Sequence, residues 1–168
     1  MILSIEKLRE LLPSSKNMSD NEVRLKIESL ETLIRKYTNN NFQSRNIRTL
    51  GNIRGGELVF DDATRFKDGD TFQISKSLYN DGVYTYGKEK TFEDEENVLI
   101  TKVVYPADVI MGVVNLFKWE LEHRDKVGIK SESLSRYSVT YYDVDASSIA
   151  GYPRGLMAFL TPYMRAKF

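Results

Sequence analysis

The segment Pro106–His123, PADVIMGVVNLFKWELEH, is the most apolar stretch of this 168-residue chain. Between Val109 and Phe117 only a glycine and an asparagine are not apolar, so a helix here would need cover on nearly every face. Asp108 is typical of a helix start, because a carboxylate is stabilised at the positive end of the helix dipole. Gly128 is typical of a helix end. We therefore predict a buried core helix, whose apolar run is about half of what a membrane span needs.

Composition limits the class of protein. A chain of this length can bury roughly 70% of its unfolded surface as one domain. It has no cysteine, which excludes disulfides and thiolate metal sites. Lys and Arg balance Asp and Glu at 24 each, which argues against a protein that mainly grips nucleic acid. The start, MILSIEKLRE, lacks the long apolar region of a signal peptide, so we expect synthesis in the cytoplasm without export by that route.

Two helices are predicted before the core helix. Apolar residues recur at helical spacing from Ile2 to Leu12, and Pro13 ends that pattern. Ser19 followed three residues later by Glu22 is a capping-box pattern. Behind it an apolar stripe continues to Tyr37 and stops at three asparagines, which predicts the second helix.

Short runs rich in β-branched and aromatic residues follow Phe42. About five strands are expected between Asn46 and Tyr105, including the runs TFQIS and VYTY. An Asp-Gly dipeptide precedes each of these two runs and is typical of a hairpin turn. After the core helix, RYSVTYYD alternates as one more strand or hairpin arm does, and a helical piece after Pro153 is expected to close the chain.

We therefore expect an α+β fold with a helical-bundle core, an inserted small antiparallel β subdomain, and a C-terminal hairpin plus helix. Residues 1–42 would supply the N-terminal helices of the core and residues 43–105 the inserted β subdomain. Residues 106–168 would supply the core helix, the hairpin arm and the C-terminal helix.

Few residues suggest catalysis or metal binding. His123 is the only histidine, so paired imidazole ligands are excluded, and a surface residue near a helix end is the simpler interpretation. The acidic run Glu93–Glu96 lacks calcium-loop spacing and is interpreted as a solvated loop. Gly55-Gly56 is followed by Glu57, which would repel a phosphate. The sequence predicts no catalytic residue, no metal site and no cofactor.

Two stretches without acidic residues are locally cationic. One is 39–56, and the hypothesis is that its arginines face a channel or passing DNA: Arg45, Arg48 and Arg54. The other is 146–168, which carries Arg154, Arg165 and Lys167. The alternative for both is a set of scattered surface arginines.

The last part of the chain is a candidate docking segment. The helix Pro153–Phe168 is expected to kink at Pro162, which aims the final residues away from the body. Residues proposed to contact a portal protein or another copy are Tyr163, Met164, Arg165, Lys167 and Phe168. On this hypothesis, deleting 162–168 should leave thermal unfolding nearly unchanged. The alternative is a terminal helix packed on its own subunit.

Four features together resemble the tailed-bacteriophage head–tail connector family, the adaptor proteins beneath the portal. The helix VRLKIESLETLIRKYTNNNF ends in an aromatic residue after an asparagine turn, and GDTFQISKSLYNDGVYTY is similar to a hairpin module of neck and tail proteins. GIKSESLSRYSVTYYD resembles the SES-x-x-x-YSVTY signature that follows the core helix in that family. A short basic and aromatic helix closes the chain. The likeness covers most of residues 20–168.

The resemblance implies a non-enzymatic virion protein of the phage neck, made in the host cytoplasm. It would form a cyclic homo-oligomer of about twelve copies beneath the portal protein, extend the DNA channel and carry the next head-completion (stopper) or tail protein. Passing viral DNA would make weak, non-specific contacts, and no membrane is implied. One alternative is a ring-forming, small-terminase-like packaging subunit that binds viral DNA, although the chain lacks a helix with clustered Lys and Arg. Another is a small phage hydrolase or nuclease, which the missing catalytic pairs oppose.

Overall fold

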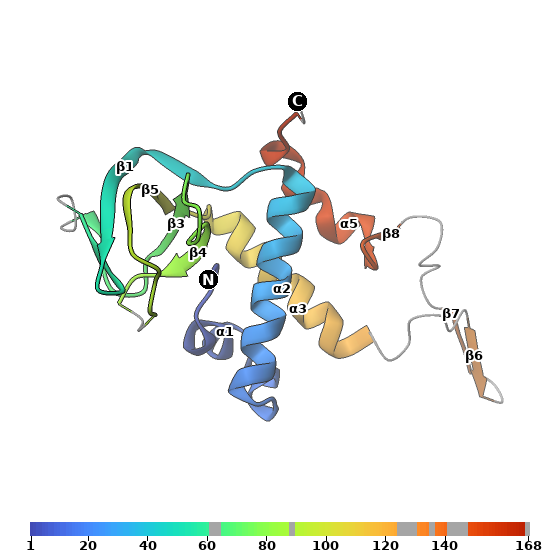
Figure 1. Ribbon diagram of the computed structural model, residues 1–168. Coiled ribbons are helices and arrows are strands. Elements are labelled where there is room, and N and C mark those ends of the chain that lie inside the picture. Colours follow the sequence, from blue (N-terminus) through green and yellow to red (C-terminus); the bar gives the residue numbers. More distant parts are fainter. Residues whose placement is uncertain (61–64, 88–89, 124–130, 135–136, 141–147, 167–168) are drawn as a thin grey trace. The chain divides into compact units, whose positions relative to one another are not determined.

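The computed structural model describes the chain except residues 61–64, 88–89, 124–130, 135–136, 141–147 and 167–168 (Figure 1). The chain divides into two compact units. The sheet unit comprises Met1–Ile2 and Asn40–Tyr105, and the helical unit comprises Leu3–Asn39 and Pro106–Phe168.

Five antiparallel strands form the curled, half-barrel sheet of the first unit, in the order β2-β1-β5-β3-β4. Their bounds are β1 (Gln43–Arg54), β2 (Glu57–Val59), β3 (Thr71–Ser75), β4 (Gly82–Thr85) and β5 (Glu95–Val103). The predicted strands are thus confirmed. The Asp81-Gly82 turn is wrong, because Gly82 already belongs to β4 and residues 76–81 make the connection.

An aromatic cluster forms the core of the sheet unit. Phe72 lies at its centre, with ring centroids 6.2 Å from Phe66 and 5.6 Å from Tyr84. The buried members are Ile53, Phe66, Phe72, Ile74, Val98 and Ile100, and partly buried Phe60, Tyr86 and Phe92 pack against them. Buried aromatic side chains each remove a large apolar area from water, so this cluster supplies the sheet unit with a core of its own.

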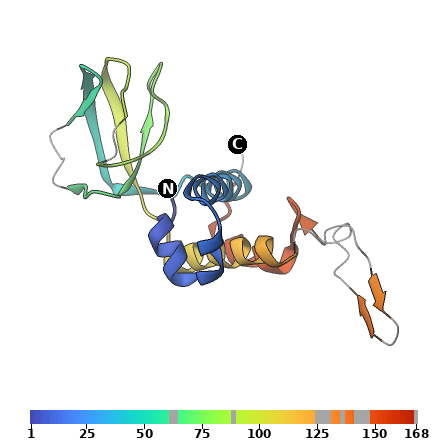
Figure 2. The ribbon, with the colours of Figure 1, turned by 90° about the horizontal axis from the view of Figure 1, so that it is seen from below.

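The expected helical-bundle core is wrong. The described residues contain four short α-helices beside the curled sheet. Only α2 (Asp20–Thr38) and α3 (Ala107–His123) exceed two turns, because α1 (Ile5–Leu11) has seven residues and α5 (Arg154–Met157) four. Figure 2 shows α2 end-on while α3 lies across the view, so the two long helices cross instead of running side by side as in a bundle.

Helix α3 is the central element of the helical unit. Its buried residues are Val109, Gly112, Val113, Val114, Leu116, Phe117 and Glu120. Met111, Asn115 and Lys118 are exposed and recur every three or four residues, so one narrow face meets solvent. The expectation that nearly every face is covered was therefore too strong. The expected helix end at Gly128 lies outside the described residues.

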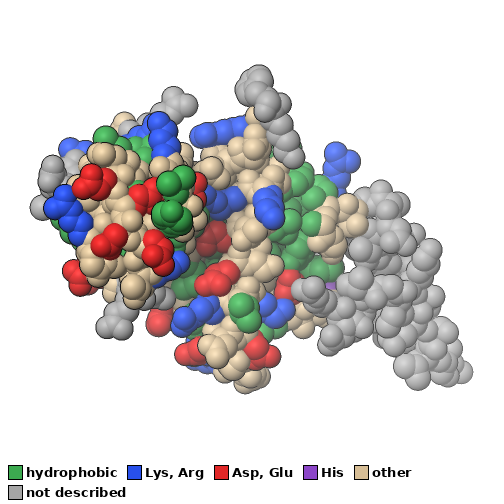
Figure 3. All heavy atoms as spheres, viewed as in Figure 1, with side chains coloured by type: hydrophobic (Ala, Val, Ile, Leu, Met, Phe, Trp, Pro, Cys, Tyr) green, Lys and Arg blue, Asp and Glu red, His purple; other side chains and the backbone are tan. Residues whose placement is uncertain are grey.

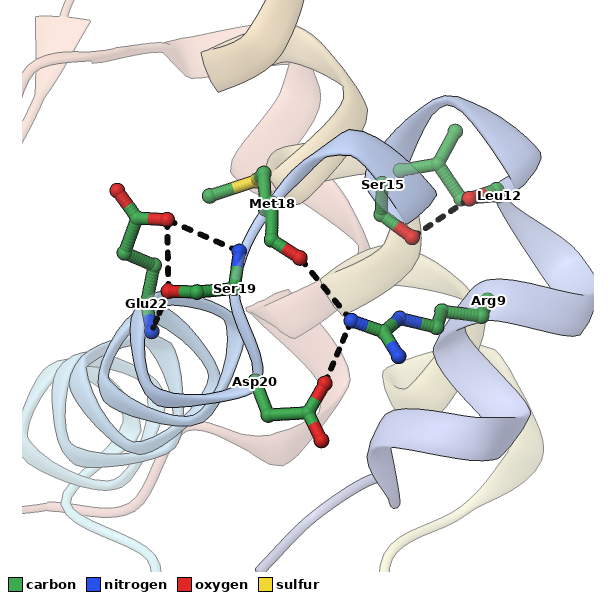
Figure 4. A network of polar contacts seen from close by, with 7 residues as sticks. All are labelled: Arg9, Leu12, Ser15, Met18, Ser19, Asp20 and Glu22. Carbon is green, nitrogen blue, oxygen red and sulfur yellow. Dashed lines mark hydrogen bonds and ion pairs between the residues drawn. The ribbon is translucent and has the colours of Figure 1, made fainter.

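A polar network fixes the start of α2 (Figure 4). The predicted capping box is confirmed: the Glu22 amide donates to Ser19 Oγ at 3.3 Å, and the Ser19 amide donates to Glu22 Oε2 at 3.0 Å. The Ser19 hydroxyl also donates to Glu22 Oε2, and the hydrogen bonds from the Ser19 hydroxyl and amide to this carboxylate hold the pKa of Glu22 below its ordinary value of 4.5. Arg9 of α1 donates to the Met18 carbonyl at 3.0 Å and pairs with Asp20 Oδ1 at 2.6 Å. The network ties α1 and the 3-10 helix η1 (Pro13–Asn17) to α2.

Removing the cap tests the start of α2. S19A is expected to lower the free energy of unfolding by about 1 kcal/mol, because the first-turn amides lose their acceptor. Trp119, the single tryptophan, lies in α3 and reports on the helical unit in urea unfolding followed by fluorescence. S29A, at an exposed position within α2, is the matched control and should leave stability unchanged or slightly higher. Equal effects of the two substitutions would contradict a role for the cap.

A second network lies within the helical unit. Glu120 is buried on α3, where Oε2 pairs with Lys26 of α2 at 2.7 Å and Oε1 accepts a hydrogen bond from the Tyr152 hydroxyl. The Trp119 ring lies 5.5 Å from the Tyr152 ring. Tyr152 belongs to β9 (Tyr152–Pro153), which pairs with β8 (Ser148–Ile149). The buried carboxylate therefore joins three segments that are far apart in the sequence.

Candidate interaction surfaces

The C-terminal segment packs on its own helical unit over most of its described length. Helix α5 is followed directly by the 3-10 helix η4 (Ala158–Tyr163). Met157, the last residue of α5, and Leu160 within η4 are both buried. Tyr163 donates a hydrogen bond to Asp108 at the start of α3, with 2.8 Å to both carboxylate oxygens. This bond raises the pKa of Tyr163 above its ordinary 10.0, because the protonated phenol is the donor.

The residues after Pro162 return to α2 instead of leaving the body. The Arg165 amide donates to the Thr38 carbonyl at 2.8 Å, and Asn39 Nδ2 donates to the Ala166 carbonyl at 2.8 Å. The chain therefore caps the C-terminal end of α2, where Asn39 takes a left-handed conformation with φ 50°. The expected kinked helix aimed away from the body is wrong for residues 163–166. Deleting 162–168 should consequently destabilise the helical unit.

The proposed contact residues differ in accessibility. Met164 is 50% exposed and Arg165 is exposed, so both are free to meet another protein. Tyr163 is half-buried and bonded to Asp108. Lys167 and Phe168 lie outside the described residues. Their contact with a portal protein or another copy stays a prediction.

The arginines proposed to face DNA lie on or beside one strand. Arg48 and Arg54 are both exposed on β1 and, six residues apart, fall on the same face of the strand. About 20 Å separates two such positions along a strand. Arg54 pairs with Glu96 at 3.5 Å, so part of its charge is compensated. Arg45 also belongs to β1, but its side chain is outside the described part of the structure.

The lone histidine and the acidic run have structural surroundings. His123 is exposed, with its ring stacked on Trp119 at a centroid distance of 5.8 Å. Asp94 accepts a hydrogen bond from the Gly56 amide at 3.0 Å, and backbone amides hold its pKa below the ordinary 3.8. Within the described ranges, no group of three or more His, Cys, Asp or Glu residues is placed to hold a metal ion.

Sequence reasoning missed an exposed apolar pair in the β3–β4 loop, residues 76–81. Leu78 is 84% exposed and Tyr79 71% exposed. Turn-forming Ser77, Asn80 and Asp81 flank the pair and were the available signal. Two adjacent large apolar side chains in solvent are a candidate contact site.

Hydrogen bonds fix the backbone of the β3–β4 loop. Asn80 is buried; its Nδ2 donates to the Glu93 carbonyl at 2.9 Å, and its Oδ1 accepts from the Glu93 amide at 3.0 Å. The Glu95 carboxylate accepts from the Leu78 amide at 2.8 Å and from the Ser77 hydroxyl. Tyr84 donates to the Asn80 carbonyl at 2.8 Å. The backbone that carries the apolar pair is thus bonded to β5 and to the residues before it.

The Glu95 carboxylate makes the loop sensitive to acid. Hydrogen bonds from Ser77 and the Leu78 amide hold its pKa below the ordinary 4.5. Its contribution to stability is therefore complete above pH 4.5 and is lost as the pH falls through the lower folded-state value. E95Q should be less stable than the wild-type chain at neutral pH, with a difference that shrinks in acid, in thermal unfolding followed across pH.

The neighbouring substitution E96Q is the control for E95Q. It removes only an exposed contact with Arg54, so little change at neutral pH is expected. A wild-type advantage over E95Q that stayed constant into acid would contradict the role of the ionised Glu95.

The predicted hairpin arm is confirmed. β6 (Ser131–Leu134) and β7 (Tyr137–Thr140) pair antiparallel, with Ser131 opposite Thr140 and Leu134 opposite Tyr137. They form a two-stranded sheet separate from the five-stranded one. A two-stranded hairpin is only marginally stable in water by itself, so this arm is a second candidate contact site.

Neither the surface charge nor the comparisons with known proteins assign a function to this chain. On the face shown in Figure 3, Lys and Arg side chains are interspersed with Asp and Glu, without a broad basic surface. No helix in the described ranges has the length and apolar character needed to cross a membrane. Neither the scan against protein-family models nor the search of curated proteins finds a match to this chain. The resemblance to head–tail connectors therefore has no support from these comparisons.

Proposed function

We propose that the chain is a non-enzymatic structural subunit of the neck of a tailed-bacteriophage virion. As a head–tail connector it forms a ring beneath the portal protein and extends the DNA channel. The ring also presents the platform for the next head-completion (stopper) or tail protein. The chain is made in the host cytoplasm and acts in the virion.

One observation carries this proposal: the segment that resembles the connector signature folds as the β6–β7 hairpin, Ser131–Thr140, after the core helix α3. A lone hairpin gains stability when a neighbouring subunit pairs with it or covers it. A hairpin arm of this kind suits a subunit that meets its neighbouring subunits only when the ring assembles. The ten tyrosines of the chain also suit protein contacts, because tyrosine gives a large contact area at low entropic cost.

Native mass spectrometry of the chain, with and without the portal protein of the same genome, tests the proposal. We expect a closed ring of about twelve copies on the portal, because repeated head-to-tail contacts close when the rotation between copies permits it. A monomeric free chain is compatible with this proposal, because weak contacts between copies become stronger when the portal holds the copies close together. A strict two-fold dimer in both conditions would contradict the proposed ring.

DNA binding separates the connector from a packaging subunit. Few phosphates are neutralised if only Arg48 and the partly compensated Arg54 face the duplex, so affinity should be weak and lost at modest salt. Fluorescence anisotropy with labelled duplex across a salt series measures this. Sequence-specific, salt-resistant binding with a nanomolar Kd would instead favour a small-terminase-like subunit.

A further inference from the structure

We propose that copies of this chain join head to tail, with the β3–β4 loop of one copy seated on the surface formed by residues 164–166 and the C-terminal end of α2 of the next. Leu78 and Tyr79 supply the apolar contact from the loop. Met164 and Arg165 supply the receiving surface. The inference rests on the ring proposed above and names the two surfaces that would build it.

The loop is suited to docking because its apolar residues are exposed while its backbone is fixed. Leu78 and Tyr79 are 84% and 71% exposed, whereas Asn80 beside them is buried. Bonds from Leu78 and Ser77 to Glu95, and from Asn80 to Glu93, order the loop before any partner arrives. A preordered loop loses less conformational entropy on binding than a flexible one.

The charge around the loop defines its partner. Residues 76–81 and 93–96 contain five carboxylates and a single lysine, Lys76. The carboxylates are Asp81, Glu93, Asp94, Glu95 and Glu96. An apolar pair with an acidic rim fits an apolar surface with a basic rim, because opposite potentials steer and orient association.

The helical unit carries a surface of that kind. Residues 164–166 lie against the end of α2, since the Arg165 amide bonds to Thr38 and Asn39 bonds to Ala166. The last turn of α2 contributes the basic residues Arg35 and Lys36. Arg165 adds a further exposed cation, and Met164, 50% exposed, adds an adaptable apolar contact.

The two surfaces differ, so their contact is heterologous. A heterologous contact repeats from copy to copy and closes into a ring when the rotation permits it, whereas a two-fold contact stops at a dimer. The proposed loop contact therefore accounts for a ring without requiring a second type of subunit.

Disulfide trapping between two single-cysteine chains tests this contact, because the natural chain has no cysteine. One chain carries L78C and the other M164C, and they are mixed under mild oxidation. We expect the disulfide between positions 78 and 164 to form at several times the yield of a control pair. In the control, L25C on the exposed side of α2 replaces L78C. Since each chain has one cysteine, any product joins two copies.

Charge reversal adds a second measurement on the same pair. E93K in the L78C chain should reduce the yield, and R165E in the M164C chain should restore it when combined with E93K. A 78–164 yield no greater than that of the control pair, or a yield indifferent to both charge reversals, overturns the inference.

The outcomes also separate this inference from the proposed function. A ring on the portal without the 78–164 disulfide leaves the connector function standing and rejects this contact. A specific 78–164 disulfide without any ring on the portal keeps the contact between copies and rejects the connector.

Discussion

F117A is expected to lower the free energy of unfolding of the helical unit by about 3–5 kcal/mol, the usual loss when a buried phenylalanine is cut to alanine. Phe117 lies on α3, is fully buried, and is among the largest side chains without solvent contact in the described structure. Its removal leaves a cavity where α3 meets its neighbours. Because a domain is stable by only about 5–15 kcal/mol, this loss should bring the unit close to unfolding.

Urea unfolding followed by Trp119 fluorescence measures the effect of F117A. M111A is the matched control on the same helix, because Met111 is 46% exposed and its truncation should change stability by less than about 1 kcal/mol. A loss below about 1 kcal/mol for F117A would mean that α3 is not the centre of this unit.

G112A is expected to destabilise the helical unit by about 1–2 kcal/mol, although alanine is the better helix former by about 1 kcal/mol. The change in stability is a loss because of packing around Gly112. A Cβ atom at Gly112 would lie 2.3 Å from Cε2 and Cζ of Phe159, so the aromatic ring of η4 has to move off α3. Thermal unfolding of G112A and the wild-type chain measures the loss.

A double-mutant cycle identifies the cause of the G112A effect. In an F159A background the Cβ has room, so adding G112A should be neutral or stabilising by up to about 1 kcal/mol. An equal loss from G112A in both backgrounds would contradict the packing of the C-terminal segment on α3.

Local patterns were sufficient for much of the secondary structure. The capping box of Ser19 and Glu22 needs only four residues, and it forms as its spacing predicts. The alternation in TFQIS places Phe72 and Ile74 in the core and leaves Gln73 partly exposed. Such signals depend only on residues within one or two helical turns or one strand, so they predict the same local structure whatever the overall fold.

The arrangement of these elements was not predictable from the same patterns. Gly51 lies inside β1, and a Cβ there would lie 2.5 Å from Ile100 Cδ1 on the paired strand β5, so this glycine serves sheet packing and does not mark a turn. The pairing of β1 with β5 joins residues about 50 positions apart, and no local pattern encodes it. The sequence patterns also did not indicate that the aromatic residues of the strands form a separate core.

The candidate surfaces were missed or misplaced for related reasons. The exposure of Leu78 and Tyr79 depends on Asn80 and Glu95, which meet across 15 positions of sequence. The C-terminal segment was expected to leave the body because Pro162 breaks an α-helix. Proline is accommodated inside the 3-10 helix η4, and the following residues bond to α2.

Electron microscopy of the purified chain mixed with the portal protein of the same genome tests the connector function most directly. We expect a ring of density coaxial with the portal at its tail-facing end, with about twelve copies surrounding an open channel. A portal that stays unchanged at saturating concentrations of the chain, or a chain that binds viral DNA as a ring but never the portal, would contradict it.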